Sequence, residues 1–306
     1  MNQKFDQEID LAIVVPCLND SQSLTKLTSE LSYVFGGGSK QKVKIIVCDD
    51  GSTEDEIKIL QRLSTENPDI TLLIGGFKSG HQSAILRGLQ EIEKRFSPIP
   101  DVVIMDADGE DNPEHAKLLI DRLQISNAKA ILAKRGVRHS GARFVFMHKM
   151  FNIPFKLLTG KKLETGNFMS IRGDWLPTLL NLPSVANHIS TTVIRYAPEA
   201  EKLTLDRNKR YYGKSKMNLS SLSLHGYGAL AVYAELVLSR IIIGTSILAL
   251  LLGSITITLV SFKLFSVTEF LPGWTSNAVI QILSLTSITI FQAITTTLII
   301  LWTRKK

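Results

Sequence analysis

Short apolar runs recur along the first half of the chain, and most of them end in polar residues. Runs of this length with polar boundaries are typical of buried strands, and they fall at residues 11–16, 43–48, 70–74, 102–105 and 130–133. Helical segments follow several of them, at about 21–35, 83–95 and 113–123. This alternation predicts an α/β fold in which a mostly parallel sheet is covered by helices on both faces.

The last part of the chain is apolar over much longer stretches. Residues 241–262 and 279–302 are each long enough to cross a bilayer and contain no charged side chain. The alternative is a hydrophobic hairpin inside a globular protein. Basic residues at 240, 263 and 304–306 flank the two stretches, so the positive-inside rule places both chain ends and the N-terminal domain in the cytoplasm. We therefore expect a multi-pass membrane protein with a domain at 1–217, an amphipathic juxtamembrane segment at 218–240 and a two-helix anchor at 241–306.

Polar side chains gather where the predicted strands end. The carboxyl ends of parallel strands share one edge, where open α/β sheets bind ligands, and this edge would carry Asn19-Asp20, Asp49-Asp50, Gly80-His81 and Asp106-x-Asp108. Carboxylate oxygens suit Mg²⁺ or Mn²⁺ shared with a substrate's phosphates. An acidic surface turn is the plain alternative for Asp106-x-Asp108 alone. An EF-hand fits poorly, because Asp111 and Lys117 stand where its loop requires Gly and Glu.

The net charge of +7 favours anionic partners, and the basic residues are clustered. Residues 134–162 hold eight basic residues, four phenylalanines and no acid. A helix of this composition suits an anionic membrane surface, and its arginines can hold a phosphate bidentately. Stacking on single-stranded nucleic acid and an ordinary solvated helix face are the alternatives; we favour the membrane because two apolar stretches follow. A second basic stretch, 207–217, can close over a pyrophosphate or simply precede a membrane helix.

Three further features of the sequence bear on secretion, disulfide bonding and zinc binding. Residues 1–10 do not resemble a signal peptide, because they are mostly polar and carry both charge signs. Cys17 and Cys48 fall near the ends of buried strands, and we expect two core thiols rather than a disulfide. The six histidines lack zinc-binding spacings.

Five motifs follow one another along the chain: Val14-Val15-Pro16-x-x-Asn19-Asp20, Val47-Cys48-Asp49-Asp50-Gly51-Ser52-Thr53, Gly80-His81-Gln82-x-Ala84-Ile85-x-x-Gly88-Leu89, Asp106-Ala107-Asp108-x-x-x-x-Pro113-Glu114 and Tyr212-Gly213-Lys214-Ser215-Lys216. In this order they resemble the motifs of the family 2 glycosyltransferases of the GT-A fold. Within that family they are most similar to the polyprenyl-phosphate branch, which includes dolichyl-phosphate mannose synthases and undecaprenyl-phosphate glucosyltransferases.

The resemblance implies a nucleotide-sugar-binding GT-A domain and a role for each matching residue. It implies donor contacts from Pro16, Asp20, Asp50, Gly80, Gln82, Asp106, Arg210, Ser215 and Lys216. It implies a Mg²⁺ or Mn²⁺ site at Asp106 and Asp108, with Glu110 as a third candidate ligand. It implies that Arg135 and Arg138 grip the acceptor phosphate next to the catalytic Asp106 and Asp108, and the basic run adds Arg143 and Lys149 as further candidates.

The implied activity is transfer of a sugar from a UDP- or GDP-linked donor to a polyprenyl phosphate (undecaprenyl or dolichyl), with inversion at the anomeric carbon. A phosphate acceptor is already anionic and needs no protein base, which agrees with Asn167 standing where relatives commonly carry Asp. Relatives also usually have Gln at the position of Glu110, and Asn-Glu in place of Asn19-Asp20. A saccharide hydroxyl acceptor and a non-catalytic membrane scaffold remain alternatives. A nucleic-acid partner is not expected, and a homo-oligomer is left open.

Overall fold

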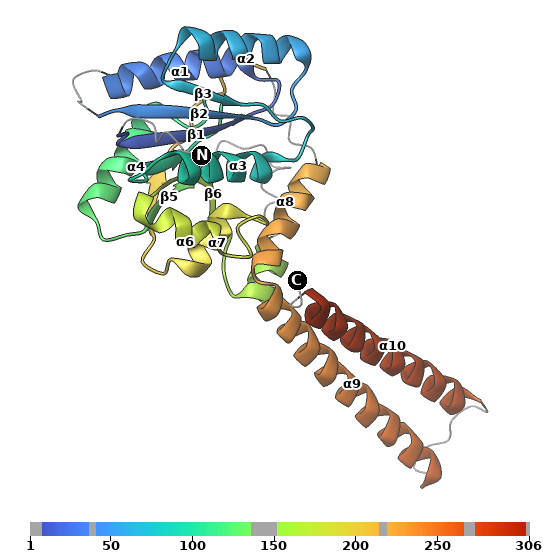
Figure 1. The fold of residues 1–306 in the computed structure, drawn as a ribbon. Helices are drawn as coiled ribbons and strands as arrows, with labels where there is room; N and C mark the ends of the chain where they lie inside the picture. The colour runs from blue at the N-terminus through green and yellow to red at the C-terminus, as the bar shows by residue number, and fades with distance from the viewer. Residues whose placement is uncertain (1–7, 37–40, 136–151, 214–218, 266–272, 304–306) are drawn as a thin grey trace. The chain divides into compact units, whose positions relative to one another are not determined.

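The computed structural model describes residues 8–36, 41–135, 152–213, 219–265 and 273–303. The chain divides into two compact units, coloured by chain order in Figure 1. The first unit comprises Met1–Lys149 and Leu163–Val232, and the second comprises Met150–Lys162 and Tyr233–Lys306.

The first unit is built on a seven-stranded sheet of order β3-β2-β1-β4-β6-β5-β7. The strands are β1 (Leu11–Cys17), β2 (Val43–Asp49), β3 (Ile70–Leu73), β4 (Asp101–Ile104), β5 (Ala130–Arg135), β6 (Thr165–Ile171) and β7 (Glu201–Leu205). Strands β1 to β4 pair in parallel, in register from Leu11 opposite Val43 on one side and Asp101 on the other. The predicted α/β fold with a mostly parallel sheet is confirmed.

Strand β6 was not among the strands expected from the sequence. It pairs antiparallel with both β4 and β5 and so separates these two strands in the sheet. Strand β7 then pairs in parallel with β5 at the sheet's edge. The insertion brings the start of β6 to the same end of the sheet as the loop that follows β4.

Helices cover both faces of the sheet because strand side chains alternate in direction. On β1, Leu11, Ile13 and Val15 pack with one set of helices, whereas Ala12 and Val14 pack with the other. The first set is α1 (Ser21–Gly36), α2 (Glu54–Glu66) and α4 (Pro113–Ile125), and the second is α3 (His81–Arg95), α6 (Leu176–Leu180) and α7 (Ile189–Tyr196). Strand β1 is fully buried between these two layers, and its neighbours β2 and β4 are mostly buried, as expected for a parallel sheet.

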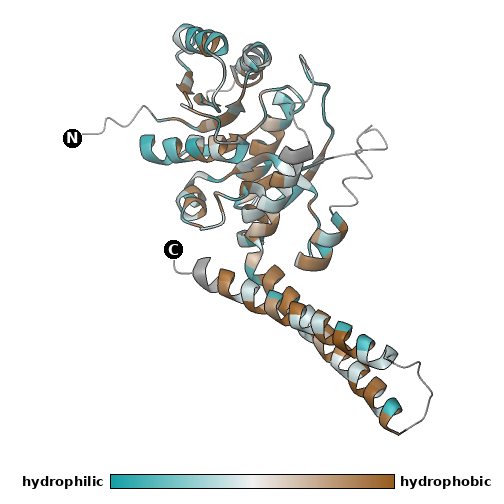
Figure 2. Ribbon diagram, turned by 90° about the vertical axis from the view of Figure 1, so that its right-hand side faces the viewer, coloured by the Kyte–Doolittle hydropathy of each residue, from teal (hydrophilic) through white to brown (hydrophobic). Residues whose placement is uncertain are grey.

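The second unit contains two long apolar helices, α9 (Ala234–Leu264) and α10 (Trp274–Thr303), which pack along one another. The most apolar 18-residue segment of each helix has a mean hydropathy of 2.2 in α9 and 1.7 in α10, and none of the residues in these segments is buried inside the protein. Figure 2 shows the apolar character along both helices. They are candidate membrane spans by length and composition, and both extend beyond the stretches expected from the sequence.

The expected juxtamembrane segment at 218–240 is divided between two helices. Helix α8 (Leu219–Val232) belongs to the first unit, and α9 begins after a turn at Tyr233. In the second unit, Phe155 of the helix at 152–159 packs edge-on against Tyr233, with ring centroids 6.2 Å apart. Arg240 of α9 donates a 2.7 Å hydrogen bond to the carbonyl oxygen of Leu157. The end of the basic run therefore packs on the first apolar helix.

Candidate active site

The loop after β4, residues 105–112 and hereafter the acid loop, holds four carboxylates. Its shape is local in origin: the Asp106 amide donates to Asp111 Oδ2 at 3.0 Å, and the Glu110 amide donates to Asp108 Oδ1 at 2.9 Å. Gly109 adopts φ +81°, a conformation that glycine reaches without steric cost. Asn112 then caps α4 by accepting from the Glu114 amide. The loop is thus a preformed turn that concentrates negative charge at the sheet's edge.

Burial makes this charge costly. Burial, followed by the neighbouring Asp106 charge, raises the pKa of Asp108. The same two causes raise the pKa of the fully buried Asp111 carboxyl to about 7. Carboxylates in this state need positive partners, and the chain supplies them from a distant segment.

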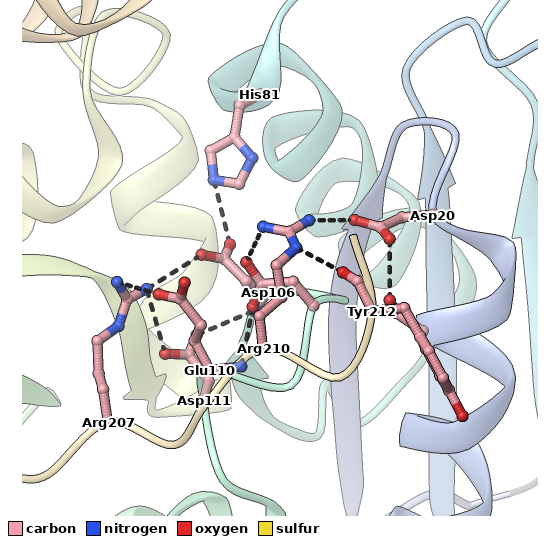
Figure 3. A network of polar contacts seen from close by, with 10 residues as sticks. Asp20, His81, Asp106, Glu110, Asp111, Arg207, Arg210 and Tyr212 are labelled. Atoms are coloured by element: carbon pink, nitrogen blue, oxygen red, sulfur yellow. Dashed lines mark hydrogen bonds and ion pairs between the residues drawn. The ribbon is translucent and has the colours of Figure 1, made fainter. Parts of the chain in front are cut away.

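That segment is residues 206–213, hereafter the basic arm, which follows β7 and crosses the acid loop (Figure 3). Backbone hydrogen bonds join the two: the Asn208 amide donates to the Glu110 carbonyl at 3.0 Å, and the Tyr211 amide to the Asp108 carbonyl at 2.9 Å. The Tyr211 ring lies directly over Gly109, where an added Cβ would come within 2.3 Å of it. The Tyr211 hydroxyl donates to Glu30 of α1.

Two arginines of the arm reach into the carboxylates. Arg210 bridges Asp108 and Asp20, with N–O distances of 2.8 and 2.5 Å. Arg207 lies 2.5 Å from Glu110 Oε2, and its other terminal nitrogen lies 3.8 Å from Asp106. Both guanidinium groups are largely buried, at 18% and 16% side-chain exposure. Ion pairs this shielded from water are strong enough to hold the arm on the loop.

A second carboxylate group organises the adjoining strand ends. Asp50, which is buried, accepts from the Ser79 amide and hydroxyl and from the Gly80 amide, at 2.8 to 3.0 Å. Asp49 accepts from the amides of the turn that follows β2. Asn19, in the left-handed region at φ +49°, accepts from the Thr53 amide. These contacts hold the ends of β1 and β2 and the start of α3 at one edge, as the sequence predicted.

The side chains of His81 and Gln82, which are neighbours in the first turn of α3, point in different directions. His81 Nε2 lies 3.5 Å from Asp106 Oδ1, so His81 faces the acid loop. Gln82 accepts the Ile189 amide at 2.9 Å and so faces α7. Gln82 was expected to contact the donor. Its side-chain oxygen joins α3 to α7, its Nε2 is buried without a partner among the described residues, and the donor contact stays a prediction.

A cavity lies beside the acid loop, between β6 and the arm. Its lining includes Asp106, Glu110, Lys134, Asn167 and Arg207. Asn167 Oδ1 is buried and has no partner among the described residues. An unsatisfied buried amide is costly and marks a place where a ligand can bind. Its charge-neutral amide stands where the resemblance leads one to look for a base.

The remaining predicted site residues differ in how much of each the structure describes. Pro16 is the last residue but one of the buried strand β1, and Gly80 directly precedes α3, both at the predicted edge. Arg135 ends β5, on the same side of the sheet as the cavity, and only its backbone is described. Five further predicted residues lie outside the described residues: Arg138, Arg143, Lys149, Ser215 and Lys216.

Sequence patterns did not single out Arg207 or Tyr211 as partners of the acid loop. Both lie about 100 residues from it, within a basic stretch that offered several equivalent cations. The one available signal was that Arg207 lies two residues after the end of the last strand, β7, whose end shares the edge with β5. Such a signal becomes specific only when the strand order is known.

The acid loop has the chemistry of a divalent cation site. Four carboxylates within six residues supply the hard oxygens that Mg²⁺ and Mn²⁺ prefer. Burial first, and then the negative charge of Asp106, raise the pKa of Asp108 and of Asp111. Within the described ranges, no three such ligands converge on one point. Each of the four carboxylates instead faces a guanidinium group, because Arg207 contacts Glu110, Asp106 and Asp111 and Arg210 contacts Asp108.

Comparison with solved structures places the fold. Glucosyl-3-phosphoglycerate synthase from Mycobacterium tuberculosis, solved with Mn²⁺, UDP and glucosyl-3-phosphoglycerate, is similar with a TM-score of 0.52 and 15% identity, over 74% of this chain and 80% of that one. The sheet order, the helix layers and this neighbour define a GT-A fold followed by two apolar helices.

Comparison of sequences then gives the family. The model of glycosyl transferase family 2 matches residues 12–182, more than half of the chain, and the protein belongs to that family. The uncharacterized glycosyltransferase YkcC of Bacillus subtilis is 24% identical over 91% of this chain and 85% of the relative. Undecaprenyl-phosphate 4-deoxy-4-formamido-L-arabinose transferase of Yersinia pestis is 22% identical over 88% and 80%. The protein is a glycosyltransferase.

Proposed function

We propose that this glycosyltransferase moves a sugar from a UDP- or GDP-linked donor to the phosphate of a membrane polyprenol, such as undecaprenyl or dolichyl phosphate. The observation that carries the proposal is the acid loop with its arginine partners, because a buried set of carboxylates and guanidinium groups matches a cation-bound diphosphate. The two apolar helices favour a lipid acceptor. The Yersinia relative, whose name gives undecaprenyl phosphate as acceptor, supports the same choice.

Each part of the site has a task in this proposal. Asp106 and Asp108, with Glu110, would hold Mg²⁺ or Mn²⁺, which would neutralise charge on the departing diphosphate. Arg210 would bind the diphosphate, together with Ser215 and Lys216.

The nucleoside would lie at the neighbouring strand ends. Asp50 and Asp20 offer carboxylate oxygens there, and Pro16 and Gly80 offer close backbone approach. Asp50 already orders the loop before α3, so its lone pairs serve both the loop and a ligand.

The transfer itself forms one bond and breaks one. A phosphate oxygen of the lipid attacks the anomeric carbon from the side opposite the diphosphate; the carbon–oxygen bond to the diphosphate breaks, and its electron pair leaves with that group. The configuration at the anomeric carbon inverts. The attacking oxygen is already anionic, so no protein base is required, in agreement with the neutral amide of Asn167 in the cavity. Arg135 and Arg138, with Arg143 and Lys149, would place the lipid phosphate.

The proposed orientation puts the catalytic domain and both chain ends in the cytoplasm. Arg240 and Lys263 bracket the first apolar helix, and three basic residues end the chain. Ser266→Cys places a thiol in the loop between the helices, and labelling of whole cells with a membrane-impermeant maleimide tests its location. A label on intact cells supports this orientation, whereas labelling only after lysis contradicts it.

A transfer assay tests the activity directly. The full chain in detergent would be mixed with undecaprenyl phosphate, Mn²⁺ or Mg²⁺ and labelled UDP- or GDP-sugars, and label would be followed into the organic phase. We expect one donor to give chelator-sensitive, lipid-phosphate-dependent label. Asp108→Asn should reduce it by at least about 100-fold, because a ligand of the cation is lost. The matched control is Asp121→Asn, an exposed position on α4. Equal turnover by both variants would exclude the metal role, and transfer to a saccharide hydroxyl instead of the lipid would exclude the acceptor.

The acceptor residues need a separate readout. Replacing Arg135 and Arg138 together with Ala should raise the KM for lipid phosphate by about tenfold or more and leave nucleotide affinity near the wild-type value. Arg122→Ala, which removes an exposed arginine paired with Glu201, is the matched control. An unchanged KM for the lipid would contradict the assignment.

A further inference from the structure

Arg207 stands among the carboxylates that a cation would bind. Its terminal nitrogens lie 2.5 Å from Glu110, 3.8 Å from Asp106 and 3.9 Å from Asp111 (Figure 3). It lines the cavity beside the acid loop together with Asp106, Glu110 and Asp111.

Arg207 and a divalent cation cannot share these ligands. A bound Mg²⁺ or Mn²⁺ sits about 2.0 to 2.6 Å from its carboxylate oxygens, which would bring two positive charges within a few ångströms of each other. The like charges repel strongly at that distance in a buried site. Cation binding therefore requires the Arg207 side chain to leave Glu110 and Asp106.

The arm is built so that only the side chain has to leave. Its backbone amides donate to the backbone carbonyl oxygens of Glu110 and Asp108 in the acid loop, and these hydrogen bonds do not involve the side-chain carboxylates. The Tyr211 ring over Gly109 and the contact of Arg210 with Asp20 fix the arm independently of Arg207. Arg210 also contacts Asp108, and a cation on Asp108 would displace that contact while the Asp20 contact remains. A released Arg207 therefore stays at the site, as a guanidinium next to a newly bound cation.

We propose that Arg207 is a placeholder for the cation and becomes a diphosphate-binding residue when the cation arrives. A guanidinium that loses a carboxylate next to a metal finds its best new partner in the anionic oxygens that the metal also binds, and its fork geometry suits a phosphate. This inference rests on the proposed function insofar as the donor carries a diphosphate. It adds an ordered exchange: cation first, then the nucleotide on the exchanged Arg207.

Binding measurements on the full chain in detergent test the exchange without turnover. Mn²⁺ affinity would be measured in the absence of nucleotide from the electron paramagnetic resonance of free Mn²⁺, and UDP and GDP affinity by calorimetry at saturating Mn²⁺. We expect Arg207→Gln to bind Mn²⁺ about tenfold more tightly, because a charged competitor is gone, and to bind the nucleotide at least about tenfold more weakly. Arg122→Gln, an exposed Arg–Glu pair, should change neither.

The opposite signs separate this role from a structural one. A residue that merely organises the acid loop would weaken both affinities on removal, and that result would overturn the proposal. Unchanged nucleotide affinity would also overturn it. Arg207→Lys covers the case of a poorly folded Gln variant: the retained charge should keep Mn²⁺ affinity near wild type, while the lost fork weakens the nucleotide. Wild-type protein that binds Mn²⁺ and a nucleotide but transfers nothing to lipid phosphate would contradict the proposed acceptor and still decide the exchange.

Discussion

His188 makes the stability of the first unit depend on pH in a defined direction. The residue is fully buried at the start of α7, where its Nδ1 accepts the Thr191 amide at 3.3 Å. Its Nε2 lies 3.0 Å from Nε2 of His225 on α8. Since Nδ1 must present a lone pair to the amide, the single ring proton belongs on Nε2, and a second proton would break the cap.

Burial first, and then the charges of His225 and His81, lower the pKa of His188 to about 3 from an ordinary value of 6.5. Between these two values the unfolded chain binds a proton that the folded chain refuses. The contribution of neutral His188 to the free energy of unfolding is therefore fully present above pH 6.5 and is lost as the pH falls from 6.5 towards 3. Each unit within that window costs about 1.4 kcal/mol, so His188 alone should remove about 2 kcal/mol of stability at pH 5 relative to pH 8.

The assay is urea denaturation of the full chain in detergent, followed by the fluorescence of Trp175. This side chain is buried in the first unit, and Trp274→Phe with Trp302→Phe removes the competing signals. His188→Asn is the matched variant, because Asn also caps helices and does not titrate. Other groups also contribute to the pH dependence, so the informative quantity is the difference between the two proteins. We expect this difference to shrink by about 2 kcal/mol from pH 8 to pH 5; parallel profiles would refute the reasoning.

Two further predictions concern the acid loop and the core thiols. Gly109→Ala combines a strained φ of +81° with a Cβ 2.3 Å from the Tyr211 ring, so it should displace the arm and weaken nucleotide binding by about tenfold or more. The control is Gly213→Ala, which has φ +69° and open space at Cβ; an equal loss in both variants, measured by calorimetry, would show that strain alone matters. Burial raises the pKa of Cys17 and Cys48 to about 12, so both thiols should resist a disulfide reagent at pH 8 until urea unfolds the domain. Fast labelling of the native protein would contradict their burial.

The sequence determined the features that depend on neighbouring residues. Apolar runs ending in Asp49-Asp50 or Asp106-x-Asp108 predicted both the strands and the edge at which their carboxylates meet, because parallel strands share one carboxyl end. The two free, buried cysteines were likewise expected from their places in buried strands. Length and lack of charge were enough to identify the two apolar helices.

Only the tertiary structure decided which distant segments meet. Strand β6 enters between β4 and β5 in the opposite direction, and nothing local in its sequence announces that partner. His81 and Gln82 are adjacent in sequence yet face the acid loop and α7, because successive residues of an α-helix point about 100° apart. In the sequence, Arg207 is one of several basic residues in its stretch. In the structure, the position of β7 places it next to Glu110 and Asp106. Contacts of this kind join residues about 100 positions apart in the chain, and a local sequence pattern carries no information about which distant segments pack together.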